Sequence, residues 1–208
     1  MDIAKIKAFT LKYKWWIVAT IAVLAAIVVV LVLLKRKSKG DNFNREQYKT
    51  ITPAQREKLE LLHPEIKQRG YELVDAIQKK GFTAEITSSY RSFEKQQRLK
   101  EQLGSMAATP GKSPHNYGLA LDIVLWKNGK KWGNYSANKQ EWEATGVPAL
   151  ARAEGWTWGG DFKSHPFDPV HFDLVKKLGV TTAALLEKGK KIYGSPEKII
   201  GNKIPLAA

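Results

Sequence analysis

The 208-residue sequence contains no cysteine, which excludes disulfide bonds, thiolate metal sites and a cysteine nucleophile. This absence leaves the redox compartment open, because a chain without cysteine tolerates either environment. Internal repeats and low-complexity tracts are also absent. Since hydrophobic residues make up 43% of the chain and charged residues 26%, we expect most of it to fold.

Acidic residues are scarce at the start of the chain. Residues 1–40 hold eight Lys and Arg but one acid, so half of the net charge of +14 lies there. The rest of the chain is mildly basic, which suits an anionic polymer such as nucleic acid, cell wall or a lipid surface. An ordinary basic surface explains the same charge. Because no nucleic-acid recognition motif is present, we expect no nucleic-acid partner.

Charge is absent from Trp15 to Leu34. These 20 residues, at about 1.5 Å each, match the roughly 30 Å hydrocarbon core of a membrane. A cleaved signal peptide is the alternative, but its apolar core would be shorter and a small-residue cleavage site would follow in place of the basic "KRKSK". We predict a cytoplasmic N-terminus at 1–14, a transmembrane signal anchor at 15–34, a basic linker at 35–51 and a folded domain at 52–208. Basic residues flank both ends of the span, so charge alone does not set its orientation.

Local signals in residues 52–208 predict an α+β fold, with a small, mainly antiparallel sheet flanked by helices. Caps and apolar periodicity predict helices from Thr52 to about Pro64, and over 66–81, 92–103, 138–154 (interrupted near Pro148) and 181–191. Alternating or apolar runs predict strands over 82–87, 118–126, 156–158 and 171–175. The dipeptide Asn128–Gly129 predicts a hairpin turn into one more strand. The tryptophans of the domain are expected mainly in the core.

One predicted strand contains an isolated carboxylate. Asp122 is the only charged residue in "GLALDIVLW", and a buried carboxylate needs a partner. His115 lies seven residues earlier, and His171 opens the segment "HFDL". Two histidines and an aspartate can form a three-ligand zinc site with an open fourth position, and the small Ala120 leaves room for the ion. A metal-free hydrogen bond between His115 and Asp122 explains the same pattern.

A second carboxylate, Asp168, precedes His171 by three residues in "DPVH". Pro169 stiffens this turn, so Asp168 can lie over the open side of a metal and take a proton from bound water. The alternative is an ordinary turn residue before proline. His165 is a rival ligand, but it lacks the Asp-x-x-His context.

Three segments together resemble a known family. The stretch "SPHNYGLALD", residues 113–122, resembles the Ser-x-His-x-x-Gly-x-Ala-x-Asp motif of the LAS metallopeptidases. This family includes D-alanyl-D-alanine carboxypeptidases and dipeptidases, and the L-alanyl-D-glutamate endopeptidases of cell walls and phage lysis. The stretch "SSYRSFEKQ" is similar to the family's Tyr-Arg-Ser segment, and "WGGDFKSHPFDPVHFDL" resembles the closing segment of the endopeptidase branch. The resemblance covers roughly residues 52–175.

The resemblance implies a role for each matching position. It implies that His115, Asp122 and His171 bind Zn²⁺ and that Asp168 is the catalytic base. Carboxypeptidase members usually have Glu at the base position, so Asp168 favours the endopeptidase branch. Arg91 is implied to stabilise a substrate carboxylate or the developing oxyanion. Weaker correspondences place Gln96 and Ser113 in the substrate site.

We therefore expect a membrane-anchored zinc peptidase that hydrolyses peptidoglycan stem peptides, with L-Ala–D-Glu as the preferred bond. Alternatives are a D-alanyl-D-alanine carboxypeptidase, a catalytically inactive cell-wall-binding module or a tethered nucleic-acid binder. Since the substrate lies outside the cytoplasmic (inner) membrane, we expect a single-pass protein whose catalytic domain faces the periplasm or cell wall. The sequence indicates no oligomeric state.

Overall fold

A computed structural model describes residues 43–163 and 166–206, and residues from Arg45 onward form one compact unit. The expected anchor at 15–34 and most of the expected linker lie outside the described residues. Within the described ranges, no helix is both long enough and apolar enough to cross a membrane. The compact unit begins seven residues before the boundary expected at 52.

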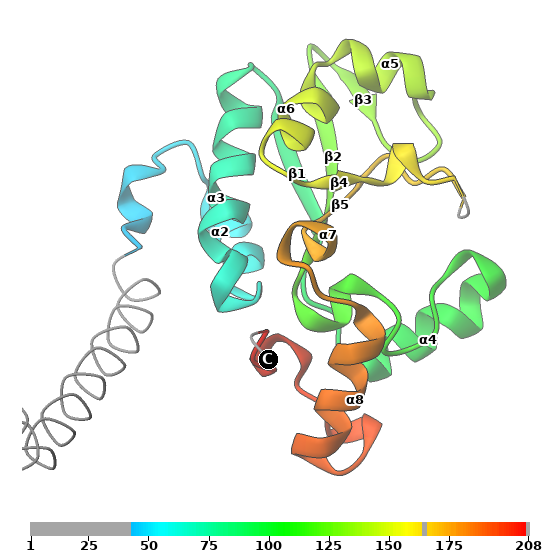
Figure 1. Ribbon diagram of the computed structural model, residues 1–208. Helices are drawn as coiled ribbons and strands as arrows, with labels where there is room; N and C mark the ends of the chain where they lie inside the picture. Colours follow the sequence, from blue (N-terminus) through cyan, green and yellow to red (C-terminus); the bar gives the residue numbers. More distant parts are fainter. Residues whose placement is uncertain (1–42, 164–165, 207–208) are drawn as a thin grey trace, which may run out of the picture. The chain divides into compact units, whose positions relative to one another are not determined.

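The centre of the unit is a five-stranded sheet in which every pairing is antiparallel, as expected. Its strands run in the order β1 (Thr83–Ser88), β2 (Ala120–Lys127), β5 (His171–Asp173) and β4 (Thr157–Trp158), and β3 (Lys130–Trp132) pairs with the far end of β2 (Figure 1). The turn between β2 and β3 falls at Asn128–Gly129, where the sequence predicted it.

Helices surround this sheet. The predicted break at Pro64 separates α2 (Pro53–Glu60) from α3 (Pro64–Lys79), and both contact β1. The helices α5 (Lys139–Ala144) and α6 (Val147–Ala153) follow the hairpin, and α4 (Phe93–Leu103) and α8 (Thr182–Tyr193) lie at the opposite end (Figure 1). Local capping explains these starts: Thr52 and Gln55 form the predicted capping box, and Ser92 accepts a hydrogen bond from Lys95 N. Short elements such as α7 (Val175–Leu178) were not predicted from the sequence.

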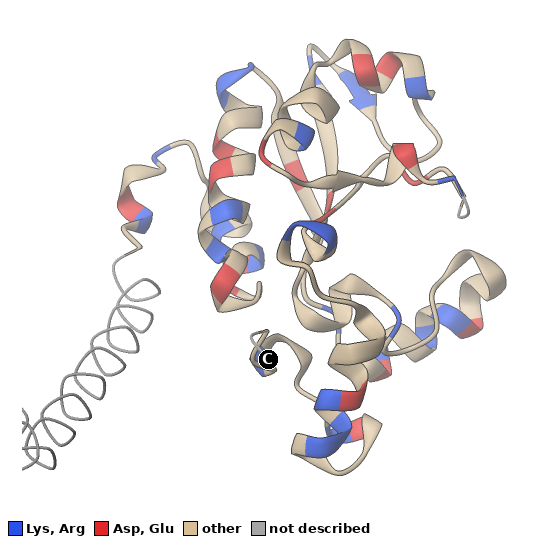
Figure 2. Ribbon diagram, viewed as in Figure 1, with Lys and Arg blue, Asp and Glu red and all other residues tan. Residues whose placement is uncertain are grey.

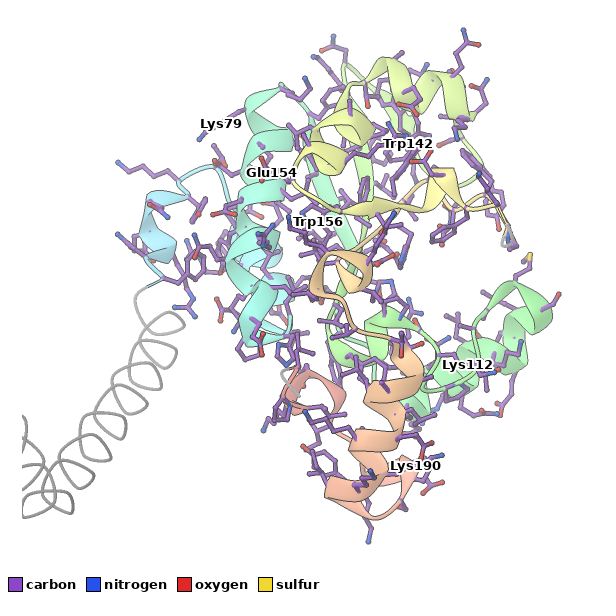
Figure 3. All side chains as sticks on the ribbon, in the orientation of Figure 1. Lys79, Lys112, Trp142, Glu154, Trp156 and Lys190 are labelled. Atoms are coloured by element: carbon purple, nitrogen blue, oxygen red, sulfur yellow. The ribbon has the colours of Figure 1, made fainter. Side chains whose placement is uncertain are left out.

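The core covers both faces of β2. Leu121 and Ile123 are buried on one face, and Ala120 and Val124 are buried on the other. Trp142 and Trp156 lie among the interior side chains, whereas Lys79 and Lys190 lie at the periphery (Figure 3). Asp122 therefore emerges from a strand that is apolar on both sides.

Residues 45–51 pack on the domain, although the sequence analysis placed them in a linker. Tyr48 and Ile51 are buried, and the Tyr48 ring lies 5.5 Å from that of Tyr71. Arg45 forms an ion pair of 2.5 Å with Glu60 of α2. These apolar and ionic contacts anchor the beginning of the unit.

A C-terminal strap, residues 199–206, packs beside the loop that carries His115. Ile204 O accepts a hydrogen bond from the buried ring of His63, and Asn202 donates to Leu61 O. A Cβ added to Gly201 would lie only 1.8 Å from the backbone oxygen of Asn116, so this approach requires glycine. The strap thus supports the residue that directly follows His115.

Candidate metal centre

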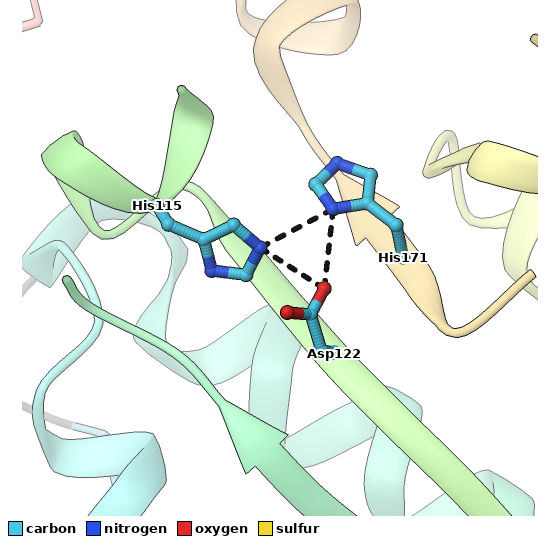
Figure 4. A group of neighbouring side chains, drawn as sticks. All are labelled: His115, Asp122 and His171. Carbon is cyan, nitrogen blue, oxygen red and sulfur yellow. Dashed lines mark hydrogen bonds and ion pairs between the residues drawn. The ribbon is translucent and has the colours of Figure 1, made fainter. Parts of the chain in front are cut away.

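Three side chains from different elements meet at the middle of the sheet (Figure 4). Asp122 and His171 are directly paired in the register of β2 and β5, and their side chains converge. His115 comes from the short 3₁₀ helix Pro114–Tyr117, which ends at Gly118. Gly118 has a φ of +65°, and a Cβ there would meet the backbone of His63 at 2.7 Å. Glycine is therefore required where the chain turns from His115 into β2.

The three facing atoms form a nearly regular triangle. His115 Nε2 lies 3.0 Å from Asp122 Oδ1 and 3.2 Å from His171 Nδ1, and the third side is 3.3 Å. Tetrahedral zinc with ligands at about 2.0–2.1 Å separates its ligand atoms by about 3.3 Å. Two imidazole nitrogens and one carboxylate oxygen are also a donor set that zinc prefers. These residues fit the ion that the sequence predicted.

In both imidazoles, the ring nitrogen that faces away from the trio contacts an oxygen atom of the protein. The outer nitrogen of His115, Nδ1, lies 2.6 Å from the backbone oxygen of Ser89, and the outer nitrogen of His171, Nε2, lies 3.3 Å from Asp173 Oδ2. Each outer nitrogen can donate its proton to that oxygen, which leaves the inner nitrogen free to bind a metal. Asp173 is itself fixed by the backbone N–H of Val175 at 3.0 Å.

The electrostatics of the site favour a cation. Burial alone would raise the pKa of Asp122, but the adjacent His115 and His171 lower it far below its usual range. Burial alone would lower the pKa of His171, but hydrogen bonds with Asp122 and Asp173 raise it to about 10. The carboxylates of Asp122 and Asp173 therefore stabilise a positive charge on or beside the His171 ring. A bound metal ion can supply that charge in place of the proton.

Arg91 brings a second positive charge to Asp122. Its Nη2 lies 3.3 Å from Asp122 Oδ2 and 3.0 Å from Ser88 Oγ, and its Nη1 lies 2.8 Å from Gln96 Oε1. The sequence indicated either a metal ion or His115 as the partner of Asp122. The structure adds Arg91 as a protein partner, because a segment distant in sequence folds back beside β2.

Asp168 lies next to the metal-ligating trio. The Oδ1 atom of its carboxylate is buried and has no hydrogen-bond partner in the described structure. Burial raises the pKa of Asp168, and the neighbouring charge of Asp122 adds to the rise. A buried, unpartnered carboxylate oxygen is costly unless a ligand or water completes it. Its position fits the predicted base.

The weaker correspondences, Gln96 and Ser113, lie behind the site. Gln96 is buried, accepts from Arg91 and donates to Ala108 O at 2.7 Å, so it positions Arg91. Ser113 is buried at the start of the 3₁₀ helix, and its side chain does not cap that helix. The sequence motifs did not single out Asn116, which is buried and donates to Arg91 O at 2.9 Å. His165, the rival ligand, lies outside the described residues.

The fold and this centre together define a small α+β domain built around one His–Asp–His site. A family model described as D-alanyl-D-alanine carboxypeptidase matches residues 107–174, which contain the trio and Asp168. The chain is 36% identical over 126 residues to the peptidoglycan L-alanyl-D-glutamate endopeptidase CwlK of Bacillus subtilis (strain 168), covering 55% of this chain and 74% of CwlK. The chain belongs to the M15 peptidase family, which confirms the resemblance seen in its motifs.

A solved structure is also similar. The L-Ala D-Glu endopeptidase ChiX of Serratia marcescens matches with a TM-score of 0.45 and 22% sequence identity, over 61% of this chain and 91% of ChiX.

Proposed function

We propose that this protein is a zinc peptidase that hydrolyses peptidoglycan stem peptides, with the L-Ala–D-Glu bond as its preferred target. The observation that carries the proposal is the triangle of His115, Asp122 and His171, with the unpartnered oxygen of Asp168 beside it. When bound, zinc supplies Lewis-acid activation of a carbonyl and of water. All other steps fall to the protein's own side chains.

Asp168 is the general base in this proposal. Its Oδ1 atom is buried and has no partner among the described residues, so it is available to receive the proton of the attacking water. The same atom then transfers the proton to the leaving amine nitrogen.

Arg91 orients Asp122 and stabilises negative charge on the substrate. Its contact with Asp122 Oδ2 leaves Asp122 Oδ1 facing the two imidazoles. The guanidinium also lines a hollow at the protein surface, where a substrate carboxylate or the developing oxyanion can reach it. Ser88 and Gln96 fix its plane.

The choice of bond rests on Asp168 and on CwlK, whose name gives that relative's activity as an L-alanyl-D-glutamate endopeptidase. D-Alanyl-D-alanine carboxypeptidase activity, the description of the matching family model, is the second candidate. The test incubates the full-length chain in detergent with purified sacculi and identifies the released peptides by mass spectrometry. Peptides that begin with D-Glu support the proposal. Free D-Ala with an intact L-Ala–D-Glu bond favours the carboxypeptidase, and binding without release favours a non-catalytic wall module.

We also propose that Trp15–Leu34 is a signal anchor that holds the domain outside the cytoplasmic membrane, because the substrate lies there. This orientation requires residues 1–14 to stay in the cytoplasm. Protease added to intact spheroplasts should degrade the domain and leave a small N-terminal fragment. Protection until lysis would place the domain inside the cell and contradict this topology.

A further inference from the structure

Two hollows of different chemistry flank the metal-ligating trio. The first, here called the α4 hollow, has a volume of about 450 Å³ and is lined in part by Ser88, Arg91, Glu94, Lys95 and Arg98. The second, here called the loop hollow, has a volume of about 440 Å³ and is lined in part by Asn134, Tyr135, Ser136, Asn138 and Phe167. Both hollows are open at the protein surface.

The order of the strands puts these hollows on opposite sides of the trio. Ser88 belongs to β1 and pairs with Asp122 of β2, so the α4 hollow adjoins the β1 side of the site. Phe167 directly precedes Asp168, whose backbone lies against Gly159 beside β4, so the loop hollow adjoins the β4 side. Since β2 and β5 lie between β1 and β4, a chain that crosses the trio meets one hollow at each end.

The α4 hollow carries an excess of positive charge. Glu94 forms an ion pair with Arg98, and Arg91 forms one with Asp122, but Lys95 has no ion-pair partner among the residues that the structure describes. On the ribbon of Figure 2, Lys and Arg positions, coloured blue, recur along α4 together with acidic positions in red. Guanidinium and ammonium groups at such a surface bind carboxylates.

The loop hollow has no such excess. Its two charged lining residues are paired elsewhere: Lys139 contacts Asp161, and Glu141 contacts Lys130. What it presents is aromatic surface, with Tyr135 92% exposed and Phe167 41% exposed, beside the amides of Asn134 and Asn138. Flat aromatic faces next to amide groups match a sugar ring, which offers an apolar face and hydroxyl groups together.

We propose that the substrate lies across the trio in one direction, with its saccharide in the loop hollow and its anionic peptide in the α4 hollow. This inference rests on the proposed function. The L-Ala amine is linked through a lactyl group to N-acetylmuramic acid, whereas D-Glu and the residues after it carry free carboxylates. A sugar ring therefore begins within about 10 Å of the scissile carbonyl, on the side away from the carboxylates. The aromatic and amide groups of the loop hollow match the sugar end of the substrate, and the cations of the α4 hollow match its carboxylate end.

The test compares two substrates of the full-length enzyme: a disaccharide-linked stem peptide and the same peptide without sugar. Tyr135→Ala should raise the KM for the disaccharide-linked peptide about tenfold and should change the KM for the sugar-free peptide by no more than about twofold. Tyr135→Phe keeps the aromatic face, so its KM for both substrates should be normal. Lys95→Ala should raise KM several-fold for both substrates. When the D-Glu carboxylate of the substrate is amidated, the KM of Lys95→Ala should equal that of the wild-type enzyme. Lys191→Ala, an exposed lysine on α8, is the matched control.

Each outcome supports or overturns the assignment. The assignment would be overturned if Tyr135→Ala changed the KM for both substrates equally. It would also be overturned if the effect of Lys95→Ala on KM depended on the sugar and not on the carboxylate. If the wild-type enzyme cleaves both substrates and neither variant changes KM, the assignment fails but the proposed function stands. If the wild-type enzyme cleaves neither, both fail. Circular dichroism and zinc content of each variant confirm that the fold and the metal centre are intact.

Discussion

Arg91 and Asp122 form an ion pair across the β1 side of the metal centre, with Nη2 3.3 Å from Oδ2 and side chains only 13% and 16% exposed. The pair couples the predicted substrate-binding cation to the predicted metal ligand. Arg91→Ala removes no metal-ligating atom, so we expect zinc to stay at one ion per chain while kcat/KM falls by about 10²–10³-fold. Metal analysis and steady-state kinetics measure both.

Arg91→Lys and Arg69→Ala complete this test. Arg91→Lys keeps the charge but loses the planar fork that contacts Ser88 and Gln96, so it should recover only part of the activity. Arg69→Ala is the matched control, because the Arg69 guanidinium donates to the backbone oxygen of Glu154 at the end of α6. Loss of zinc in Arg91→Ala would show that Arg91 acts mainly by holding Asp122.

The metal ligands can be tested one at a time. His115→Ala and Asp122→Ala should each lose most of the zinc, because each removes one of the three facing atoms. His165→Ala is the matched control, since it removes the rival imidazole, and it should keep its zinc. Elemental analysis after dialysis against a weak chelator measures the content. Full zinc in either trio variant would contradict the assignment.

The role of Asp168 separates metal binding from proton transfer. Asp168→Asn should keep the zinc but lower kcat by about 10²–10⁴-fold, because an amide cannot accept the proton of the attacking water. Single-turnover cleavage of a defined stem peptide measures the step. Near-normal turnover would mean that another group is the base.

Asp173 should tune the affinity for the metal without touching it. Its Oδ2 lies 3.3 Å from the outer nitrogen of His171. Asp173→Asn weakens that contact, and comparable changes around metal sites reduce affinity by about 10–100-fold. Competition with a chromogenic chelator gives the Kd. Asp75→Asn, which alters another buried carboxylate that contacts Thr50, should leave the Kd unchanged.

Acid should destabilise the domain through Glu60. Burial alone would raise its pKa, but hydrogen bonds from Arg45, Lys67 and Tyr71 lower it from 4.5 to about 2. A lowered folded-state pKa gives stability that is complete above the unfolded value of 4.5 and is lost as pH falls towards 2. Since Glu60 is partly exposed, we expect about 1 kcal/mol after solvent screening.

Urea unfolding of wild type and Glu60→Gln checks this linkage. The variant should be less stable near neutral pH and should approach the wild-type value as the pH falls below about 2, where the wild-type carboxyl also becomes neutral. A difference that is constant with pH would assign the effect to packing.

The sequence predicted those features that depend on local chemistry. Thr52 caps a helix wherever the chain places it, and Asn128–Gly129 forms its turn without distant help. Motif matching also placed His115, Asp122 and His171 together, although they come from three elements. The cap and the turn succeed because each signal lies within one short segment, whereas the trio was brought together by matching separate short motifs to one family.

The rest depends on contacts between distant segments, which no short pattern records. The hydrogen bond from Asn116 to the backbone of Arg91, and the support that Ser89 gives to His115, become visible only when the loops are in place. Gln96 could be matched to the family, but its position behind Arg91 could not be read from spacing. Tyr48 and Ile51 were assigned to a linker, because two apolar residues in a polar segment show no periodicity.

The C-terminal strap has a consequence for the order of folding. The hydrogen bonds from His63 to Ile204 and from Asn202 to Leu61 each join residues 141 positions apart. Closing so long a loop costs chain entropy, and the contacts offset this cost only after they have formed. Contacts between distant residues therefore slow folding. Because Gly201 packs directly against Asn116, we expect the neighbouring imidazole to reach its final place only after this closure. Metal uptake would then mark the completion of folding rather than its nucleus.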